Sequence, residues 1–218
     1  MNNYIEFGKP ILKKQKSVDD KPQTKITNTS KFIELGNPLL RKGCRLIDKK
    51  ELNTSYFQDL LKRLTLLVKD EGVGLAAPQI GENVHVFIMN LLDEKTKTNK
   101  ISFVVNPKII SYSPILEIDQ EACLSVPGYI GFLERSLEVE VEFINEKGIK
   151  KRRKFKNFKA RVFQHEFDHL FGILYVDRIT GKKISSFVEL QNEIPFFPKT
   201  LMTKEKFEKK YCKPTPSE

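Results

Sequence analysis

Apolar residues recur at helical spacing between residues 54 and 70 of the chain. The apolar face of this segment consists of Phe57, Leu60, Leu61, Leu64, Leu67 and Val68. Thr54 or Ser55 can accept a hydrogen bond from a free backbone N–H group in the first turn, and Gly72 lies just beyond the end. The pattern therefore predicts an amphipathic helix that buries one face in a core.

Later segments have the patterns of β-strands. Val84–Met89 and Ile101–Asn106 are largely apolar runs, which is typical of strands buried on both faces. Leu137–Asn145 alternates instead, with valine and phenylalanine on one face and glutamate on the other, which indicates a half-buried antiparallel strand. A turn at Asn145–Gly148 leads into a second, very basic strand over Ile149–Phe155.

A second helix is predicted over Lys159–Phe171. Its apolar positions are Val162, Phe163, Phe167 and Leu170. Gly172 stands where a glycine commonly ends a helix. Strands that precede a central helix predict an α+β fold, in which antiparallel β-sheets pack around that helix.

The 218 residues are enough for one domain with appendages. We expect a disordered N-terminal extension over residues 1–30, a folded domain over 31–180, and a basic, partly helical segment over 181–218. The 3 cysteines form no even disulfide framework, which fits a reducing compartment. No apolar run is long enough to span a bilayer and no signal peptide is visible, so we expect a cytoplasmic protein that does not bind membranes.

One segment occurs twice in the sequence. Tyr4–Lys14 repeats Phe32–Lys42 in register, with Ile, Glu, Gly, Pro, Leu and Lys at matched positions. We hypothesise that the first copy can occupy the place of the second, in its own molecule or in a neighbour.

Candidate chemistry is concentrated in Gln164–His169. His165 and His169 are four residues apart, so a helix places both imidazoles on one face, where they can bind one metal ion. Glu166 between them is then close enough to exchange protons with a water molecule at that metal. The alternative is an ordinary helix with two partly buried histidines, although the chain has only 3 histidines in all.

A catalytic metal site needs a third protein ligand. No histidine follows His169, and Cys123, in a short segment between two strand-like stretches, is the candidate. A thiolate and two imidazoles leave one position open, which is the arrangement of a catalytic rather than a structural metal. Two alternatives stay open here: Cys123 is an inert buried thiol, or a peptidase uses the same helix with another third ligand.

A glycine-rich segment, Gly72–Ile80, adds a possible binding loop. Its two glycines allow a ligand to approach the backbone closely, and the amide of Gln79 can donate to an oxygen that gains charge. This loop, Glu121–Ser125 and Gln164–His169 together resemble the three signature motifs of the peptide deformylases. The first and third match fully, and the second differs where Ala122 replaces the usual glycine. The resemblance extends from about residue 32 to residue 179.

The resemblance implies a metal-dependent hydrolase that removes the N-formyl group from the N-terminal methionine of nascent polypeptides and releases formate. The implied metal ligands are Cys123, His165 and His169. The implied metal is Fe(II), with Zn, Ni or Co able to substitute. Glu166 would be the general base that then delivers a proton to the leaving amine. Gln79 and the backbone N–H of Leu124 would stabilise the oxyanion.

The resemblance also implies how a peptide would bind. Gly74 would pair with the peptide backbone as an added strand, and Val73 and Val162 would line the pocket for the methionine side chain. Ala122 lies where the backbone would meet the substrate, and Ile130 stands where some family members carry an arginine. These two departures keep open a non-catalytic relative that binds peptides or ribosomes.

The net charge of +10 and the pI of about 9.4 favour contact with polyanions. Basic side chains crowd the hairpin over residues 147–161 and the C-terminal segment around 204–213. A deformylase meets its substrate at the ribosome, so we expect these surfaces to dock on ribosomal RNA, with a solvated charged face as the alternative. A bacterial cytoplasm is the simplest compartment, and an organelle is the alternative.

Overall fold

The computed structural model describes residues 31–69, 72–93, 96–179 and 184–186. The expected extension over 1–30 and most of the C-terminal segment lie outside these residues. The strands are β1 (Gly74–Ala76), β2 (Val86–Asp93), β3 (Thr98–Tyr112), β4 (Leu116–Cys123), β5 (Val126–Ser136), β6 (Glu138–Ile144), β7 (Lys150–Lys156) and β8 (Ile184–Ser186). The helices are α1 (Ser55–Val68), α2 (Asn157–His169) and the 3₁₀ helices η1 (Pro38–Arg41), η2 (Lys49–Asn53), η3 (Ala77–Ile80) and η4 (Tyr175–Arg178).

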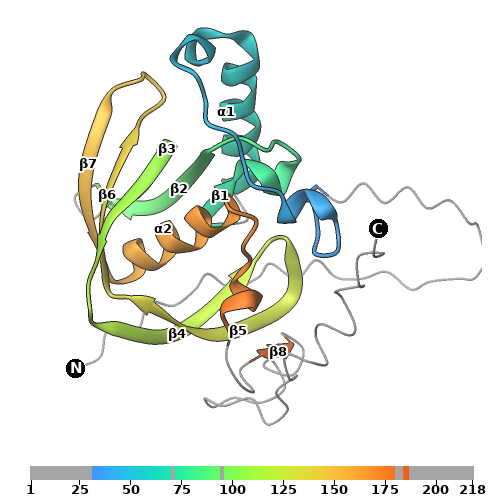
Figure 1. Ribbon diagram of the computed structural model, residues 1–218, viewed down its shortest axis with the longest axis vertical. Coiled ribbons are helices and arrows are strands. Elements are labelled where there is room, and N and C mark those ends of the chain that lie inside the picture. The colour runs from blue at the N-terminus through green and yellow to red at the C-terminus, as the bar shows by residue number, and fades with distance from the viewer. Residues whose placement is uncertain (1–30, 70–71, 94–95, 180–183, 187–218) are drawn as a thin grey trace, which may run out of the picture.

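The strands form two antiparallel sheets, as the predicted α+β fold requires. One sheet has the order β1-β2-β3-β6-β7 and the other the order β4-β5-β8. Helix α2 lies between them, packed against β1, β2, β6 and β7 on one side and β5 on the other (Figure 1). Among the described residues, no helix is long and apolar enough to cross a membrane.

Strand β2 explains how the five-stranded sheet is covered on both faces. Val86 and Ile88 are buried in the cluster that contains the apolar face of α1. Phe87 and Met89 point the other way, into the cluster that contains Phe163 of α2. Because successive side chains of a strand point to opposite faces, a largely apolar strand needs a covering layer on each side. The two helices supply these layers.

The predicted first helix is confirmed. Thr54 is the N-cap residue of α1, and its side chain accepts a hydrogen bond from the backbone N–H of Phe57. Its buried residues are Phe57, Leu60, Leu61, Leu64 and Val68, and Leu67 is partly buried. Each fully buried side chain of this size contributes about 1.5–3 kcal/mol of transfer free energy, so packing of this face stabilises the helix in its place.

The remaining predicted elements are found with shifted bounds. Strands β2 and β3 are longer than the predicted apolar runs, and α2 begins and ends two residues earlier than predicted. Gly72–Ile80, interpreted as a loop, instead contains the short strand β1 and the helix η3. Gly172 has a φ of +71°, and a Cβ there would lie 2.7 Å from the backbone carbonyl carbon of Arg41, so glycine is required after α2.

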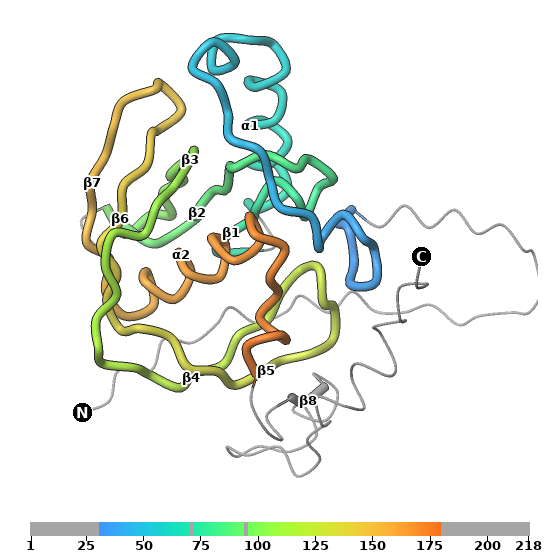
Figure 2. The backbone as a smooth tube through the Cα atoms, viewed as in Figure 1, coloured from blue at the N-terminus to red at the C-terminus, as the bar shows by residue number. Residues whose placement is uncertain are grey.

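The described chain begins with a segment that lies beside the residues following α2, and we call residues 32–42 the strap (Figure 2). Its backbone N–H groups at Ile33 and Leu35 donate to the carbonyl oxygens of Gln79 and Ser125, each at 2.7 Å. Arg41 donates to the carbonyl oxygen of Gly172 and forms an ion pair with Asp177. The strap therefore joins three parts of the fold that are distant in sequence.

Candidate metal centre

The end of β4 and one face of α2 bring Cys123, His165 and His169 together. One ligand atom from each residue lies within 4.8 Å of the others, so the three can hold one metal ion. Cys123 Sγ lies 3.4 Å from His169 Nε2, and the two imidazole rings are 5.1 Å apart at 75°. In the part of the chain that the structure describes, no other group of three such side chains is close enough to hold a metal. The cysteine that the sequence suggested as third ligand therefore lies where it could complete the site.

Glu121 fixes the orientation of one histidine. Its carboxylate lies 2.8 Å from His165 Nδ1, which leaves Nε2 of that ring for the metal position. Burial alone would raise the pKa of Glu121, but hydrogen bonds from Arg135 and His165 outweigh it and hold that pKa well below its usual value. The sequence patterns had assigned no role to the Glu121 side chain. The two-residue spacing from Cys123 was a usable signal, because it places both side chains on one face of β4.

The two histidines differ in their electrostatic environment. Burial lowers the pKa of His169 well below its usual value, which favours the neutral form that binds metals. Burial also opposes charge on His165, but hydrogen bonds with Cys123 and Glu121 outweigh it and raise that pKa well above its usual value. Binding of a metal at this site would therefore release a proton from His165.

Gln79 connects the segment before β2 to the cysteine. Its amide nitrogen lies 3.4 Å from Cys123 Sγ and 3.3 Å from Ser125 Oγ, and its amide oxygen accepts a hydrogen bond from the N–H of Ala76. The side chain is only 2% exposed, so these contacts hold its NH₂ group toward the metal position. Leu124, whose backbone N–H is the second predicted oxyanion donor, directly follows Cys123.

Glu166 points its carboxyl group toward β1. A Cβ added at Gly74 would lie 2.8 Å from Glu166 Cδ, so only glycine leaves room for this side chain. Glu166 Oε2 is buried and has no hydrogen-bond partner among the described residues, and burial raises the pKa of Glu166 to about 7. A carboxyl group with a free oxygen and a pKa near neutrality can both accept and return a proton.

The other residues singled out for peptide binding differ in how far they are exposed. Val162 is 5% exposed on α2, whereas Val73 is 39% exposed in the segment leading into β1. Ala122 is an exposed residue of β4 opposite Ile130, and its φ is not positive. Replacing glycine with alanine therefore causes no backbone strain at this position. Ile130 is 8% exposed and pairs with β8, so it does not present a free side chain to solvent.

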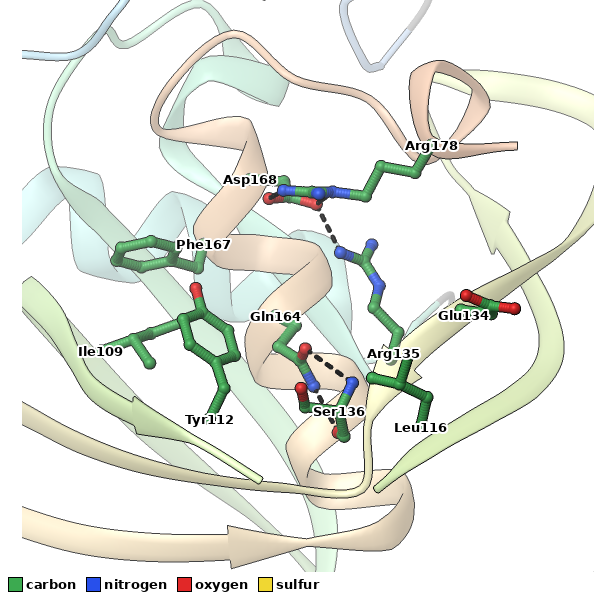
Figure 3. Close-up of a pocket in the computed structure, with 10 residues that line it drawn as sticks. All are labelled: Ile109, Tyr112, Leu116, Glu134, Arg135, Ser136, Gln164, Phe167, Asp168 and Arg178. Atoms are coloured by element: carbon green, nitrogen blue, oxygen red, sulfur yellow. Dashed lines mark hydrogen bonds and ion pairs between the residues drawn. The ribbon is translucent and has the colours of Figure 1, made fainter. Parts of the chain in front are cut away.

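A buried charge network extends from the metal position across α2. Glu121 accepts hydrogen bonds from Arg135 and Arg161, and Arg135 also bonds Asp168. Arg178 completes the chain by pairing with Asp168 near a cavity of about 260 Å³ on another face of α2 (Figure 3). This cavity contains none of the three metal donors. On its wall Asp168 is bonded to Arg135 and Gln164 to Ser136, so these polar groups are already paired, and the cavity is not the chemical site (Figure 3).

Comparisons with known proteins agree with this geometry. Residues 29–185 match the family described as Polypeptide deformylase. The peptide deformylase of Thermotoga neapolitana is 39% identical over 146 residues, which cover 65% of this chain and 85% of that protein. That of Pseudothermotoga lettingae is 41% identical over 133 residues, or 61% and 72% of the two chains.

Solved structures give the same result. The Met-Ala-Ser-bound class I type b peptide deformylase from Acinetobacter baumannii is 31% identical, with a TM-score of 0.62 over 68% of this chain and 96% of that chain. A peptide deformylase from Synechococcus elongatus in complex with actinonin is 33% identical, with a TM-score of 0.63 over 68% of this chain and 79% of that chain.

Proposed function

The chain belongs to the polypeptide deformylase family, and on that basis we propose which of its residues carry out the family's reaction. The reaction is hydrolysis of the formyl amide at the N-terminal methionine of nascent polypeptides, which releases formate and a free amine. The single observation that carries the proposal is the buried carboxyl group of Glu166, whose Oε2 has no hydrogen-bond partner among the described residues and which follows His165, one of three side chains that can hold a metal.

The metal ligands in this proposal are Cys123, His165 and His169. A thiolate and two imidazoles suit Fe(II), our proposed native metal, and also Zn, Ni and Co. The donor set is complete for a catalytic site because three protein ligands leave a position open. When bound, the metal would polarise the formyl carbonyl and make a water molecule more acidic.

The remaining roles belong to residues around that position. Glu166 takes a proton from the attacking water and returns it to the leaving nitrogen, which its pKa of about 7 permits. The amide of Gln79 and the N–H of Leu124 donate to the formyl oxygen as it gains negative charge. These donors cost little reorganisation because Gln79 is already held by Ala76 and Ser125.

The substrate in this proposal is a formyl-methionyl peptide in extended form. The solved relative from Acinetobacter baumannii binds Met-Ala-Ser, which is the product of such a reaction. Gly74 would pair with the peptide backbone at the edge of β1, and Ala122 would face it from β4. Val73 and Val162 would border the methionine side chain.

Formate release from formyl-Met-Ala-Ser by anaerobically purified protein tests the assignment. We expect Glu166→Gln to lower kcat by about 10²–10⁴-fold while metal content is kept. Glu140→Gln, at an outward position of β6, is the matched control and should be active. Cys123→Ala should lose the metal. Full activity of Glu166→Gln, or unchanged metal binding by Cys123→Ala, would refute the corresponding role.

Ribosome docking through the basic hairpin is a second part of the proposal, and the fold limits which charges take part. Glu138, Glu140 and Glu142 of β6 pair with basic residues of β7 on the outer face of the sheet. These pairs neutralise much of the charge that the sequence shows. The excess positive charge therefore lies on Lys147, Lys150, Lys151 and Arg153. The basic C-terminal segment lies outside the described residues.

Co-sedimentation with ribosomes at increasing salt tests this docking. Reversal of Lys150 and Arg153 to Glu should weaken binding. It should also reduce the salt dependence, because a variant that makes fewer phosphate contacts releases fewer counterions when it binds. Reversal of Lys62 and Lys69 on or beside α1 is the control. If the hairpin variant and the α1 control variant bind ribosomes equally well, the hairpin has no role in docking. Binding at the ribosome would place the protein in a bacterial cytoplasm or an organelle, as in its bacterial and chloroplast relatives.

A further inference from the structure

Three positions of the strap require particular residue types, and the earlier segment Tyr4–Lys14 has the same residue types at the matching positions. Gly36 has a φ of +103°, which favours glycine. Pro38 opens η1, where a proline is well suited, and Leu40 is 1% exposed in the core. The residues at the matching positions of the earlier segment are Gly8, Pro10 and Leu12. The repeat therefore preserves the features that the structure requires.

The match extends over the whole strap. Of the eleven positions compared between residues 4–14 and 32–42, six are identical. Four more keep the same chemical class: Tyr for Phe, Phe for Leu, Ile for Leu, and Lys for Arg. Only Lys9, opposite Asn37, changes class. A solvated extension has no reason to keep a glycine, a proline and apolar residues in this order.

We propose that residues 4–14 are a second occupant of the strap position and can replace residues 32–42 in the same molecule. Both copies run in the same direction, so the exchange is a shift of the chain by 28 residues. Residues 15–42 would then form a loop between the end of the first copy, residue 14, and residue 43, where the chain continues as before. The entropic cost of closing a loop grows slowly with its length, and the tether favours the molecule's own copy over a neighbour's.

The first copy would bind more weakly than the strap that is seen. The Asn37 side chain accepts a hydrogen bond from the N–H of Leu39, which Lys9 cannot do. Arg41 makes two contacts with the Asp177 carboxylate, whereas a lysine at that position offers only one ammonium group. The strap that is seen is therefore the favoured occupant, and the first copy becomes important when that strap is damaged or displaced.

The exchange would act on the chemical site through two backbone hydrogen bonds. The N–H of Ile33 holds the carbonyl of Gln79, whose side chain contacts Cys123. The N–H of Leu35 holds the carbonyl of Ser125, two residues after that cysteine. Backbone bonds do not depend on side-chain identity, so the first copy can reproduce them. The end of the strap differs, because the Asn37 cap is lost and the ion pair with Asp177 keeps one ammonium group in place of a guanidinium. The occupant of the strap position therefore sets how firmly these segments are held.

Thermal unfolding of full-length glycine variants tests the exchange. Gly36→Val strains the strap, and we expect its melting temperature to fall by about 4 °C more when Gly8 is also changed to Val. Gly8→Val alone should have no effect. Gly128→Val is the matched control: Gly128 has a φ of +81° and open space for a side chain, but no counterpart in the first copy. Its cost should be the same with and without Gly8→Val.

Additive costs of Gly8→Val and Gly36→Val would overturn the proposal. If Gly36→Val fails to fold in both backgrounds, Gly36→Ala provides the same comparison with less strain. These readouts do not use formate release, so they are independent of the proposed catalytic roles.

Carbodiimide cross-linking reports the exchanged state directly. Asp177 pairs with Arg41 in the strap that is seen, and a guanidinium does not couple to a carboxylate. In Gly36→Val, Lys13 would take that place, and we expect a Lys13–Asp177 cross-link in the monomer band that disappears when Gly8→Val is added. The absence of this cross-link in Gly36→Val, or its presence only in a dimer band, would refute replacement within one molecule.

Discussion

Gly74 is the residue at which the smallest change should remove activity. Glu166 packs so closely against its backbone that a single added carbon would lie 2.8 Å from the carboxyl carbon. We expect Gly74→Ala to lower kcat by about 10²-fold or more, because a displacement of about 1 Å at a reacting group has that effect. Metal content should be unchanged. Gly43→Ala, where nothing lies within 4 Å, is the control, and near-normal activity of Gly74→Ala would contradict the role of Glu166.

Ala122 leads to the opposite expectation, although it is one of the two departures from the family pattern. It lies in the strand β4, its side chain is exposed, and its φ is not positive. We expect Ala122→Gly to lower the free energy of unfolding by about 0.5–1 kcal/mol, since glycine loses more conformational freedom in a strand. Urea unfolding and kcat/KM measure the two effects. A tenfold gain in kcat/KM would show that the alanine methyl obstructs the substrate.

At the scale of elements, buried charges join β4, β5 and α2 behind the metal position. Glu121, Arg135, Arg161 and Asp168 are each 4–6% exposed and are bonded to one another. Such a network is costly to desolvate, but removal of one member leaves its partners as uncompensated charges. The network therefore fixes β4 and α2, which present the metal donors, relative to each other and to β5.

Arg135→Met tests this network. It would leave Glu121 and Asp168 with one fewer cation each, and we expect a loss of about 3–5 kcal/mol of unfolding free energy. Metal affinity should fall as well, by about 10–100-fold, because Glu121 orients His165. Arg152→Met removes exposed ion pairs on β7 and should cost less than about 1 kcal/mol. Denaturant unfolding that gives equal losses for the two variants would contradict this account.

How well an element could be predicted from sequence depends on which face of it carries function. Helix α1 was predictable because its buried face is entirely apolar. Strand β4 was harder to predict, because it has Leu116 and Ile118 exposed while Glu121 and Cys123 are buried. The hydrophobic alternation of β4 is thus inverted at the site that carries the chemistry. Strand β1 has three residues, too few for a period-two pattern.

At the scale of the whole molecule, the site depends on contacts between distant parts of the sequence. The i, i+4 pair of histidines could be predicted locally, because one helix determines its geometry. The contact between Glu121 and His165 spans 44 residues, and the contact between Gln79 and Cys123 also spans 44. A periodic pattern of apolar residues does not indicate which residues make contact across such separations in sequence. Only the packing of α2 between the two sheets brings these residues together.

This long-range assembly predicts that metal binding stabilises the fold. The donors come from β4 and α2, so the unfolded chain cannot present them together and the metal binds the folded state. At a free metal concentration of about 1,000 times Kd the gain is about 4 kcal/mol, which raises Tm by roughly 8–16 °C for a domain of this size. Scanning calorimetry of chelator-treated and Fe(II)-reloaded protein under anaerobic conditions measures the difference. Cys123→Ser, which keeps the side-chain size but replaces the thiolate, should show a smaller rise or none. An equal rise in this variant would mean that the metal stabilises the protein at another place.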